Sequence, residues 1–429
     1  MAITWTRLHE RLGIEARPLT YDDIRAAVDQ QLDEDAQLEW KGHRPSSEGE
    51  RVELGKDLAA MANSGGGLIV FGVGEETRDD GSKIPVHTDV ALDEHAEQQV
   101  RSVAWGRVRP IIAGVEIEQL ENPGEPGRGV LAVWVPPSPD APHFYEKDGQ
   151  PPAAPWRDGP HIANLREREI ERAYRDRFRR QDDAASALDR LVEGASRRLA
   201  FRGPYGGRWT IVAARPLSGP PLGFRPPDRA VVQTVVEDVE ARERAIFVGR
   251  DALGSGFASQ VDHNPGVGLR RWSFVVRGHN EPNDGLASWT LCEMHHDGST
   301  VLAFGSGEPG VGVDQRPYLS HEQVEHTVGS AVALARSWTA ALRTSGPISM
   351  RATVHNSHDG PFWLAPASRR GGVSTARAVS DPVTRVEPVD SMLGARDDLL
   401  TDLEVAHDLV RGIINQFGVD AVVTIKSAG

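Results

Sequence analysis

The segment 53–73 constrains the fold of this chain more than any other. Apolar residues recur at helical spacing in ELGKDLAAMAN (53–63), and three glycines (65–67) then end that helix. The run LIVFGV (68–73) has no polar side chain, which is typical of a strand covered on both faces. The sequence therefore predicts a helix, a tight glycine turn and a central β-strand.

A second strand is predicted just before this helix. Leu38 and Trp40 alternate with Glu39 and Lys41, the period-two pattern of a half-buried strand. We expect Leu38 and Trp40 to face the core, and Glu39 and Lys41 to share the opposite face. Other elements expected in this half are a capped helix at 20–30, a helix near 92–104, paired strands at 111–120 and 129–137, and a charged helix at 166–180.

The second half of the chain has a different pattern of apolar and turn-forming residues. From about residue 203, apolar runs alternate with Gly/Pro turns and indicate a meander of strands, among them 229–236 and 245–249. Helices are expected at 321–342 and 397–417, the first with Ser320 as its N-cap.

The predicted fold class is α+β in two domains, because 429 residues exceed the size of one ordinary domain. The expected divisions are an N-terminal domain (1–180), a helical linker (181–202) and a C-terminal domain (203–429) with a mostly antiparallel sheet and two long helices.

Charge and cysteine content narrow the function classes. The formal net charge of −14 counts against sequence-independent coating of nucleic acid, so a nucleic-acid site must be a local basic patch. Cys292 is the single cysteine, which excludes an intrachain disulfide and a thiolate zinc site. With no apolar run of about 18 residues and no secretory signal, we expect a soluble cytoplasmic protein without a membrane span.

A family resemblance rests on the order of motifs in the first half. Glu34 precedes Glu39-Trp40-Lys41, then comes LAAMANSGGGLIVFGV (58–73), and the block PHFYEKDG…PWRDGPHIANLREREIERAY closes the region. This arrangement resembles the Alba-like domain of the Schlafen family, whose older label is divergent AAA ATPase, over residues 20–180.

The resemblance implies nucleic-acid binding, of RNA or regulatory DNA, and in some members metal-dependent RNA cleavage by three acids. Matched by position, those acids are Glu34, Glu39 and Glu75, which would bind Mg²⁺ or Mn²⁺ through carboxylate oxygens. Glu75 stands where nuclease members have Asp, and its extra methylene changes the ligand geometry. Glu76 or Asp79 could serve in its place.

Basic side chains are the expected phosphate contacts: Lys41, Arg44, Arg157, Arg179 and Arg180. The alternative is that Glu39 and Lys41 form an ion pair on a solvated strand face, and that the arginines of the 166–180 helix pair with its acids at i,i+4.

ATP binding has little support. The nearest string to a P-loop, Gly49 to Asp57, has one residue too many and an aspartate where magnesium needs a hydroxyl. The glycines 65–67 follow a helix and precede a strand, the reverse of a P-loop, and are interpreted as a tight turn.

Three functions remain open. The first is a nucleic-acid-binding protein with metal-dependent endoribonuclease activity. The second is a non-catalytic regulator that binds DNA or nucleotide and senses a partner through its C-terminal domain. The third is a protein-interaction scaffold, and in each case the C-terminal domain could form a homo-oligomer.

Overall fold

The computed structural model divides by its internal contacts into two compact units, Met1–Arg180 (unit 1) and Gln181–Gly429 (unit 2). Both units combine helices with sheets, which confirms the α+β class. No helix in the described part of the chain is long and apolar enough to cross a membrane. The described residues are 3, 6–15, 17–79, 81, 83–159, 161–202, 207–220, 227–248, 256–261, 264–277, 288–306, 310–311, 317–344, 346–357, 359–365, 380–394 and 397–427.

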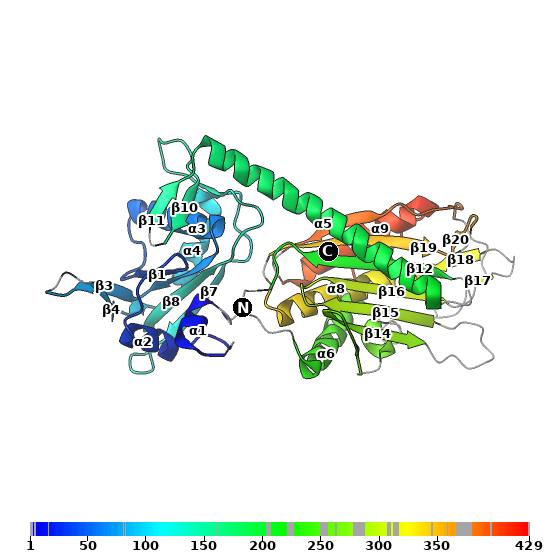
Figure 1. Cartoon of the computed structure of the whole chain (residues 1–429), viewed down its shortest axis with the longest axis horizontal. Coiled ribbons are helices and arrows are strands. Elements are labelled where there is room, and N and C mark those ends of the chain that lie inside the picture. The colour runs from blue at the N-terminus through cyan, green and yellow to red at the C-terminus, as the bar shows by residue number, and fades with distance from the viewer. Residues whose placement is uncertain are drawn as a thin grey trace. The chain divides into compact units, whose positions relative to one another are not determined.

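Unit 1 is built around one mixed sheet (Figure 1). Its elements are α1 (Arg7–Leu12), α2 (Tyr21–Asp29), β1 (Leu38–Lys41), α3 (Glu48–Asn63), β2 (Gly67–Phe71), β3 (Val73–Thr77), β4 (Lys83–His87), β5 (Val90–Ala91), α4 (Glu94–Arg107), β6 (Val108–Arg109), β7 (Glu116–Glu121), β8 (Arg128–Val135), β9 (Phe144–Tyr145), β10 (Pro155–Asp158), β11 (His161–Asn164) and the start of α5 (Glu167–Arg202).

The strand order in this sheet is β1-β2-β8-β5, with β7 also paired to β8. β1 runs parallel to β2, with Leu38 opposite Leu68, while β8 is antiparallel to β2, β5 and β7. Helices α1 and α2 pack on one face, around Leu38 and Trp40. Helices α3 and α4 pack on the other face, around Ile69 and Val133. The central strand is therefore covered on both sides, as its apolar sequence predicted.

Local sequence signals fix several element ends in unit 1. Thr20 accepts a hydrogen bond from the Asp23 amide, and the Asp23 carboxylate accepts one from the Thr20 amide, so the expected cap of α2 is a capping box. Gly66 has φ +74°, and a Cβ there would lie 2.7 Å from the Val135 carbonyl oxygen. The glycines between α3 and β2 thus form a tight turn with close backbone approach. The string from Gly49 to Asp57 lies inside α3 and forms no phosphate-binding loop.

Unit 2 contains a larger antiparallel sheet in the order β13-β14-β15-β16-β12-β19-β21. Its elements are the end of α5, β12 (Arg208–Pro216), α6 (Arg229–Ile246), α7 (Phe257–Gln260), β13 (Gly266–Gly268), β14 (Arg271–Arg277), β15 (Ser288–His295), β16 (Thr300–Ser306), β17 (Gly310–Val311), β18 (Pro317–Ser320), α8 (His321–Ala341), β19 (Ile348–Asn356), β20 (Trp363–Ala365), β21 (Val389–Leu393), α9 (Leu399–Ile414) and a 3₁₀ turn (Asn415–Phe417).

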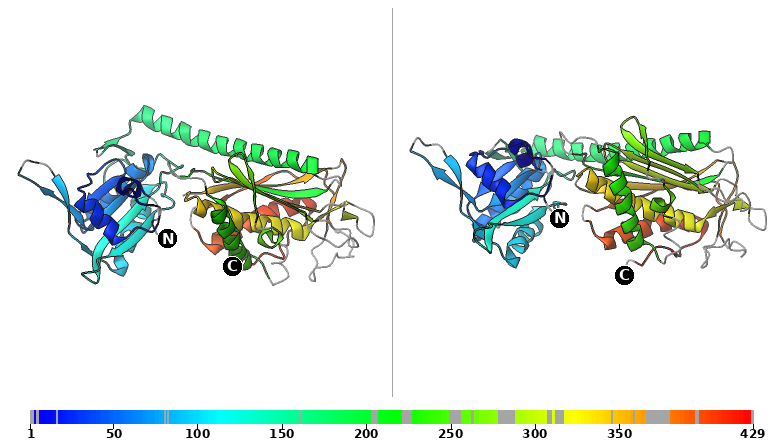
Figure 2. Two further views of the ribbon diagram at one scale, coloured as in Figure 1. Left: turned by 60° about the horizontal axis from the view of Figure 1, so that its bottom comes forward. Right: turned by 90° about the horizontal axis from the view of Figure 1, so that it is seen from below.

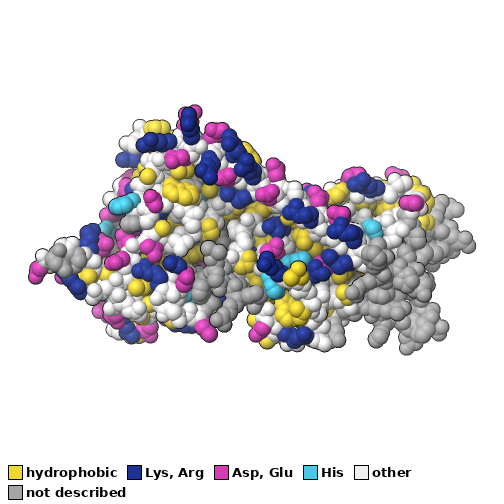
Figure 3. Space-filling view, in the orientation of Figure 1, with side chains coloured by type: hydrophobic (Ala, Val, Ile, Leu, Met, Phe, Trp, Pro, Cys, Tyr) yellow, Lys and Arg dark blue, Asp and Glu magenta, His cyan; other side chains and the backbone are white. Residues whose placement is uncertain are grey.

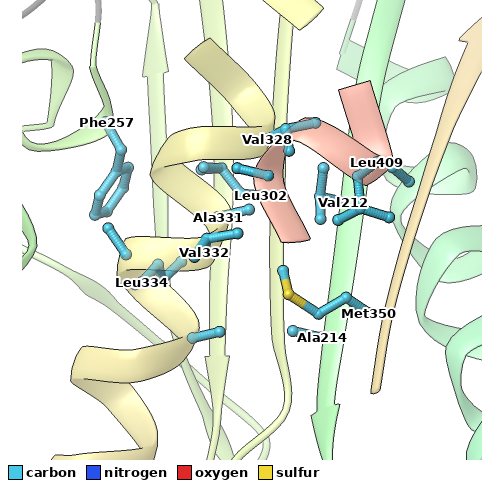
Figure 4. Packing of buried hydrophobic residues seen from close by; sticks show 14 of the residues in the cluster. Val212, Ala214, Phe257, Leu302, Val328, Ala331, Val332, Leu334, Met350 and Leu409 are labelled. Carbon is cyan, nitrogen blue, oxygen red and sulfur yellow. The ribbon is translucent and has the colours of Figure 1, made fainter. Parts of the chain in front are cut away.

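Helices cover both faces of this sheet (Figure 2). The face toward α6, α8 and α9 holds the main core, in which Val212 and Met350 of the sheet meet Val328 of α8 and Leu409 of α9 (Figure 4). The opposite face packs against the second half of α5 through Leu188, Ala195 and Leu199, which contact Trp209 and Leu291. The stretch 181–202, expected to be a linker, is therefore part of the packing of unit 2.

Two sequence expectations were wrong in detail. The runs 229–236 and 245–249 were expected to be strands. The first lies wholly within helix α6, whereas α6 takes in only Ala245 and Ile246 of the second. In that second run Phe247 is extended and forms an isolated bridge with Ile425, and residue 249 lies outside the described residues. Val232, Val235, Val236 and Val239 are buried at helical spacing, and Asp228 caps the helix. The charged helix expected at 166–180 and the helical linker expected at 181–202 are one continuous helix, α5. The helix begun by Ser320 is confirmed, since Ser320 accepts a hydrogen bond from the Gln323 amide.

Candidate nucleic-acid interface

The polar face of β1 forms a buried charge network with α3. Leu38 and Trp40 are buried in the core, and Glu39 and Lys41 share the opposite side, as predicted. The Lys41 ammonium nitrogen lies 2.7 Å from a Glu39 carboxylate oxygen and 3.0 Å from an Asp57 carboxylate oxygen. Asp57 comes from α3 and is only 3% exposed. Lys41 is thus held between two carboxylates.

Arg157 of β10 completes the network. Its Nη2 lies 2.6 Å from Glu39 Oε2 and donates to the Asp35 carbonyl at 3.1 Å. The Arg157 side chain has no exposed surface, and its Nε and Nη1 have no hydrogen-bond partner in the described part of the chain. Arg157 was predicted to contact phosphate, but a side chain with no solvent-exposed atoms cannot do so. In this structure it neutralises Glu39.

The charges of the network set the ionisation of its members. Burial alone would raise the pKa of Glu39, but the positive charges of Lys41 and Arg157 lower it. The Lys41 pKa is raised, since Asp57 and Glu39 outweigh the effect of burial. The pKa of Asp57 is raised, first by burial and then by the charge of Glu39, because two carboxylates share one ammonium group. Glu39 is therefore a paired carboxylate.

The other two predicted acids lie near this network. Glu34 accepts a hydrogen bond from the Trp40 amide at 2.7 Å. Its pKa is raised, first by burial and then by the negative charges of Glu39 and Glu75. Glu75 lies on β3 and pairs with Lys83 of β4 at 2.6 Å. The three carboxylates are thus close enough to interact electrostatically, although each has a separate protein partner.

A metal ion would need several of these oxygens at once. Among the described residues, no three His, Cys, Asp or Glu side chains form a group that could hold a metal ion. Glu39 in particular has one oxygen on Lys41 and the other on Arg157. As they stand, Glu34, Glu39 and Glu75 do not fit the Mg²⁺ or Mn²⁺ site that the resemblance implies, and that site stays a prediction.

The start of α5 carries an exposed row of arginines (Figure 3). At residues 168, 172, 175 and 179 the spacing of four, three and four places these side chains along one side of the helix. Arg172 and Arg179 have no ion-pair partner among the described residues, whereas Arg175 pairs with Glu171 at 2.5 Å. Arg180 donates to the Pro139 carbonyl, and no ion pair joins it to an acid of the described residues.

Two exposed aromatic rings adjoin this row. Tyr174 and Phe178, one turn apart on α5, are 36% and 59% exposed. Their ring centroids are 6.3 Å apart and the planes are inclined by 26°, a stacked pair. Exposed arginines beside exposed aromatic rings combine phosphate contact with base stacking, as in proteins that bind single strands.

A comparison with protein families supports the resemblance that the order of motifs indicated. Residues 34–165 match the family model described as Schlafen, AlbA_2. The chain carries a Schlafen AlbA_2 domain. The match confirms the resemblance that the motifs indicated. It runs from Glu34 past Arg157, so the buried charge network lies within the matched residues.

The solved structures that match the chain include one N-terminal domain. The N-terminal domain of a "putative ATP-dependent DNA helicase RecG-related protein" from Nitrosomonas europaea has 23% sequence identity and a TM-score of 0.24, over 35% of this chain and 93% of that chain. No curated protein matches the chain. The AlbA_2 domain supports a nucleic-acid-related function for unit 1.

Asp57 is the network residue that sequence reasoning missed. It was considered only as a departure from a P-loop, in a helix interior where an acid usually faces solvent. A signal was present, because Asp57 sits among apolar residues on a helix whose neighbours Leu54, Leu58 and Met61 are buried. A buried acid requires a partner, and in the structure Lys41 is that partner.

Proposed function

We propose that the AlbA_2 domain binds single-stranded nucleic acid without cutting it, and that the exposed side of α5 near Arg172 and Arg179 is a contact surface. The observation that carries this proposal is that Arg172 and Arg179, which have no ion-pair partner among the described residues, lie beside the stacked Tyr174 and Phe178. Guanidinium groups would contact phosphates and Phe178 would stack on a base. A local patch of this kind suits a chain whose overall charge is −14.

The test removes the unpaired arginines. In the full chain, Arg172→Gln with Arg179→Gln should weaken binding of a fluorescently labelled single-stranded oligonucleotide about tenfold in an anisotropy titration, because two phosphate contacts are lost. Glutamine retains helix propensity, so α5 should persist. The matched control is Arg25→Gln with Arg101→Gln, which removes the same charge from arginines already paired with Asp22 and Glu97. Equal losses in both double variants would contradict the proposed surface.

Metal-dependent RNA cleavage is a second candidate, favoured by the mutual electrostatic influence of Glu34, Glu39 and Glu75. The full chain is incubated with labelled RNA, with and without Mn²⁺. Cleavage that requires Mn²⁺ and is lost in Glu34→Gln would establish this candidate and contradict binding without cutting. From the pairing of Glu39 with Lys41 and Arg157 we expect intact RNA in both conditions.

A further inference from the structure

Unit 1 has a hollow of about 420 Å³ away from the carboxylate network. It lies between the loop that follows β1, the first turn of α3, and α4. Its volume falls within the range of roughly 300–1,000 Å³ typical of ligand pockets. The lining residues are Arg44, Arg51, His95, Gln98, Gln99, Ser102 and Val103.

The lining is basic and polar, in contrast to the acidic chain. It combines two guanidinium groups, an imidazole, two amides and a hydroxyl group, and among the side chains that the structure describes no acid lines the hollow. Guanidinium groups bind phosphate oxygens through paired N–H donors, and amides and hydroxyls suit the polar edges of a sugar or a base. The donor set therefore favours an anion that also carries hydrogen-bonding groups.

The two arginines of the lining, Arg51 and Arg44, differ in how strongly they are paired with acids. The Arg51 side chain is 47% exposed and forms a long ion pair with the exposed Glu48, at 3.9 Å. Arg44 donates to both oxygens of Asp93, at 3.0 and 3.2 Å. Asp93 is the N-cap of α4 but makes no side-chain capping hydrogen bond. Arg51 is thus available to a ligand at once, and Asp93 competes with a ligand for Arg44.

Contacts between the loop after β1, α3 and α4 fix the walls of the hollow. Gln99 of α4 donates to the Pro45 carbonyl and so ties the loop to the helix. Helices α3 and α4 approach closely at Gly55, where a Cβ would lie 3.7 Å from Val103 Cγ1 and 3.4 Å from Arg107 Cβ. These are ordinary van der Waals distances, so the two helices are packed against each other at this point. The spacing of the cationic groups is therefore set by packed secondary structure.

We propose that this hollow binds a phosphorylated nucleotide, with Arg51 and Arg44 on the phosphate and Gln98 and Ser102 toward the nucleoside. The nucleotide is either free or the phosphorylated end of a strand. The free form does not depend on the α5 surface, since a mononucleotide can occupy the hollow whether or not α5 binds nucleic acid.

The test compares three variants of the full chain by calorimetric titration with AMP, and adenosine serves as the ligand without phosphate. Arg51→Gln should weaken AMP binding about tenfold, because a charge-assisted contact is lost. Asp93→Asn should tighten it about threefold, since Asn still suits an N-cap while Arg44 is released. Arg101→Gln, on α4 but outside the lining, should change it less than twofold.

A second arm identifies the source of the nucleotide. In the Arg172→Gln/Arg179→Gln background, a 5′-phosphorylated hexanucleotide is compared with its 5′-hydroxyl counterpart. An Arg51-dependent preference for the phosphorylated strand supports a strand end, and AMP binding without this preference supports a free nucleotide. The proposal is overturned if adenosine binds as well as AMP, if Arg51→Gln and Arg101→Gln have equal effects, or if neither AMP nor the 5′-phosphate is bound. None of these results depends on whether the α5 surface binds a strand.

Discussion

Glu39→Ala should lower the free energy of unfolding of unit 1 by about 3–5 kcal/mol, because it leaves a buried guanidinium without its counter-charge. Arg157 has no exposed side-chain surface, and Glu39 is its only ion-pair partner among the described residues. Its Nε and Nη1 have no hydrogen-bond partner to compensate. Lys41 would remain paired with Asp57, so the loss of stability should be largest around Arg157.

The measurement is hydrogen exchange of peptides from β1 and β10, which reports on unit 1 separately from unit 2. Glu75→Ala is the matched control, since Glu75 pairs with the exposed Lys83 and its loss should cost less than about 1 kcal/mol. Glu39→Ala with Arg157→Met should recover part of the loss, because the unpaired charge is then absent. Similar effects of Glu39→Ala and Glu75→Ala would show that Glu39 is not a structural partner of Arg157.

Glu243→Gln should make unit 2 markedly less sensitive to pH. The Glu243 carboxylate is 1% exposed and accepts hydrogen bonds from Ser330 Oγ and from the Phe257 amide, the latter at 2.7 Å. Burial raises its pKa to about 7, despite these hydrogen bonds. A carboxyl group whose folded pKa is raised gives stability that is fully present below its unfolded pKa of about 4.5 and is lost as pH rises through 7.

The stability difference between the Gln variant and the natural chain should therefore move by about 3 kcal/mol in favour of the variant between pH 4.5 and pH 8. It is measured by urea unfolding at both pH values. Glu240→Gln removes an exposed carboxylate from the same helix and should show little such movement, since Glu240 pairs with Arg244 at the surface. A difference that stays constant with pH would refute the raised pKa of Glu243.

Most of the structural features that could be predicted from the sequence depend on local patterns of residues. The alternation in β1, the glycine turn before β2 and the Ser320 cap all depend on neighbouring residues, and all are confirmed. The error at α6 is also local. Its valines favour a strand by propensity, yet their spacing is helical, and burial against α8 decides the outcome.

The charge network could be predicted only in part, because its members meet through tertiary structure. Glu39 and Lys41 are two residues apart, and their shared face followed from strand geometry. Arg157 is 118 residues from Glu39, and no sequence spacing shows that its side chain turns inward. The same packing separates it from the predicted phosphate contacts Arg179 and Arg180, which stay exposed on α5.

The salt dependence of single-strand binding tests the central claim most directly. The affinity of the full chain for a labelled oligonucleotide is measured by anisotropy across a range of sodium chloride concentrations. If the unpaired arginines of α5 contact phosphates, the logarithm of the affinity should fall linearly with the logarithm of salt concentration, by about 0.7 per phosphate contact, and Arg172→Gln with Arg179→Gln should make that slope shallower by about 1.4. A slope unchanged by these substitutions, or no binding at low salt, would contradict the account.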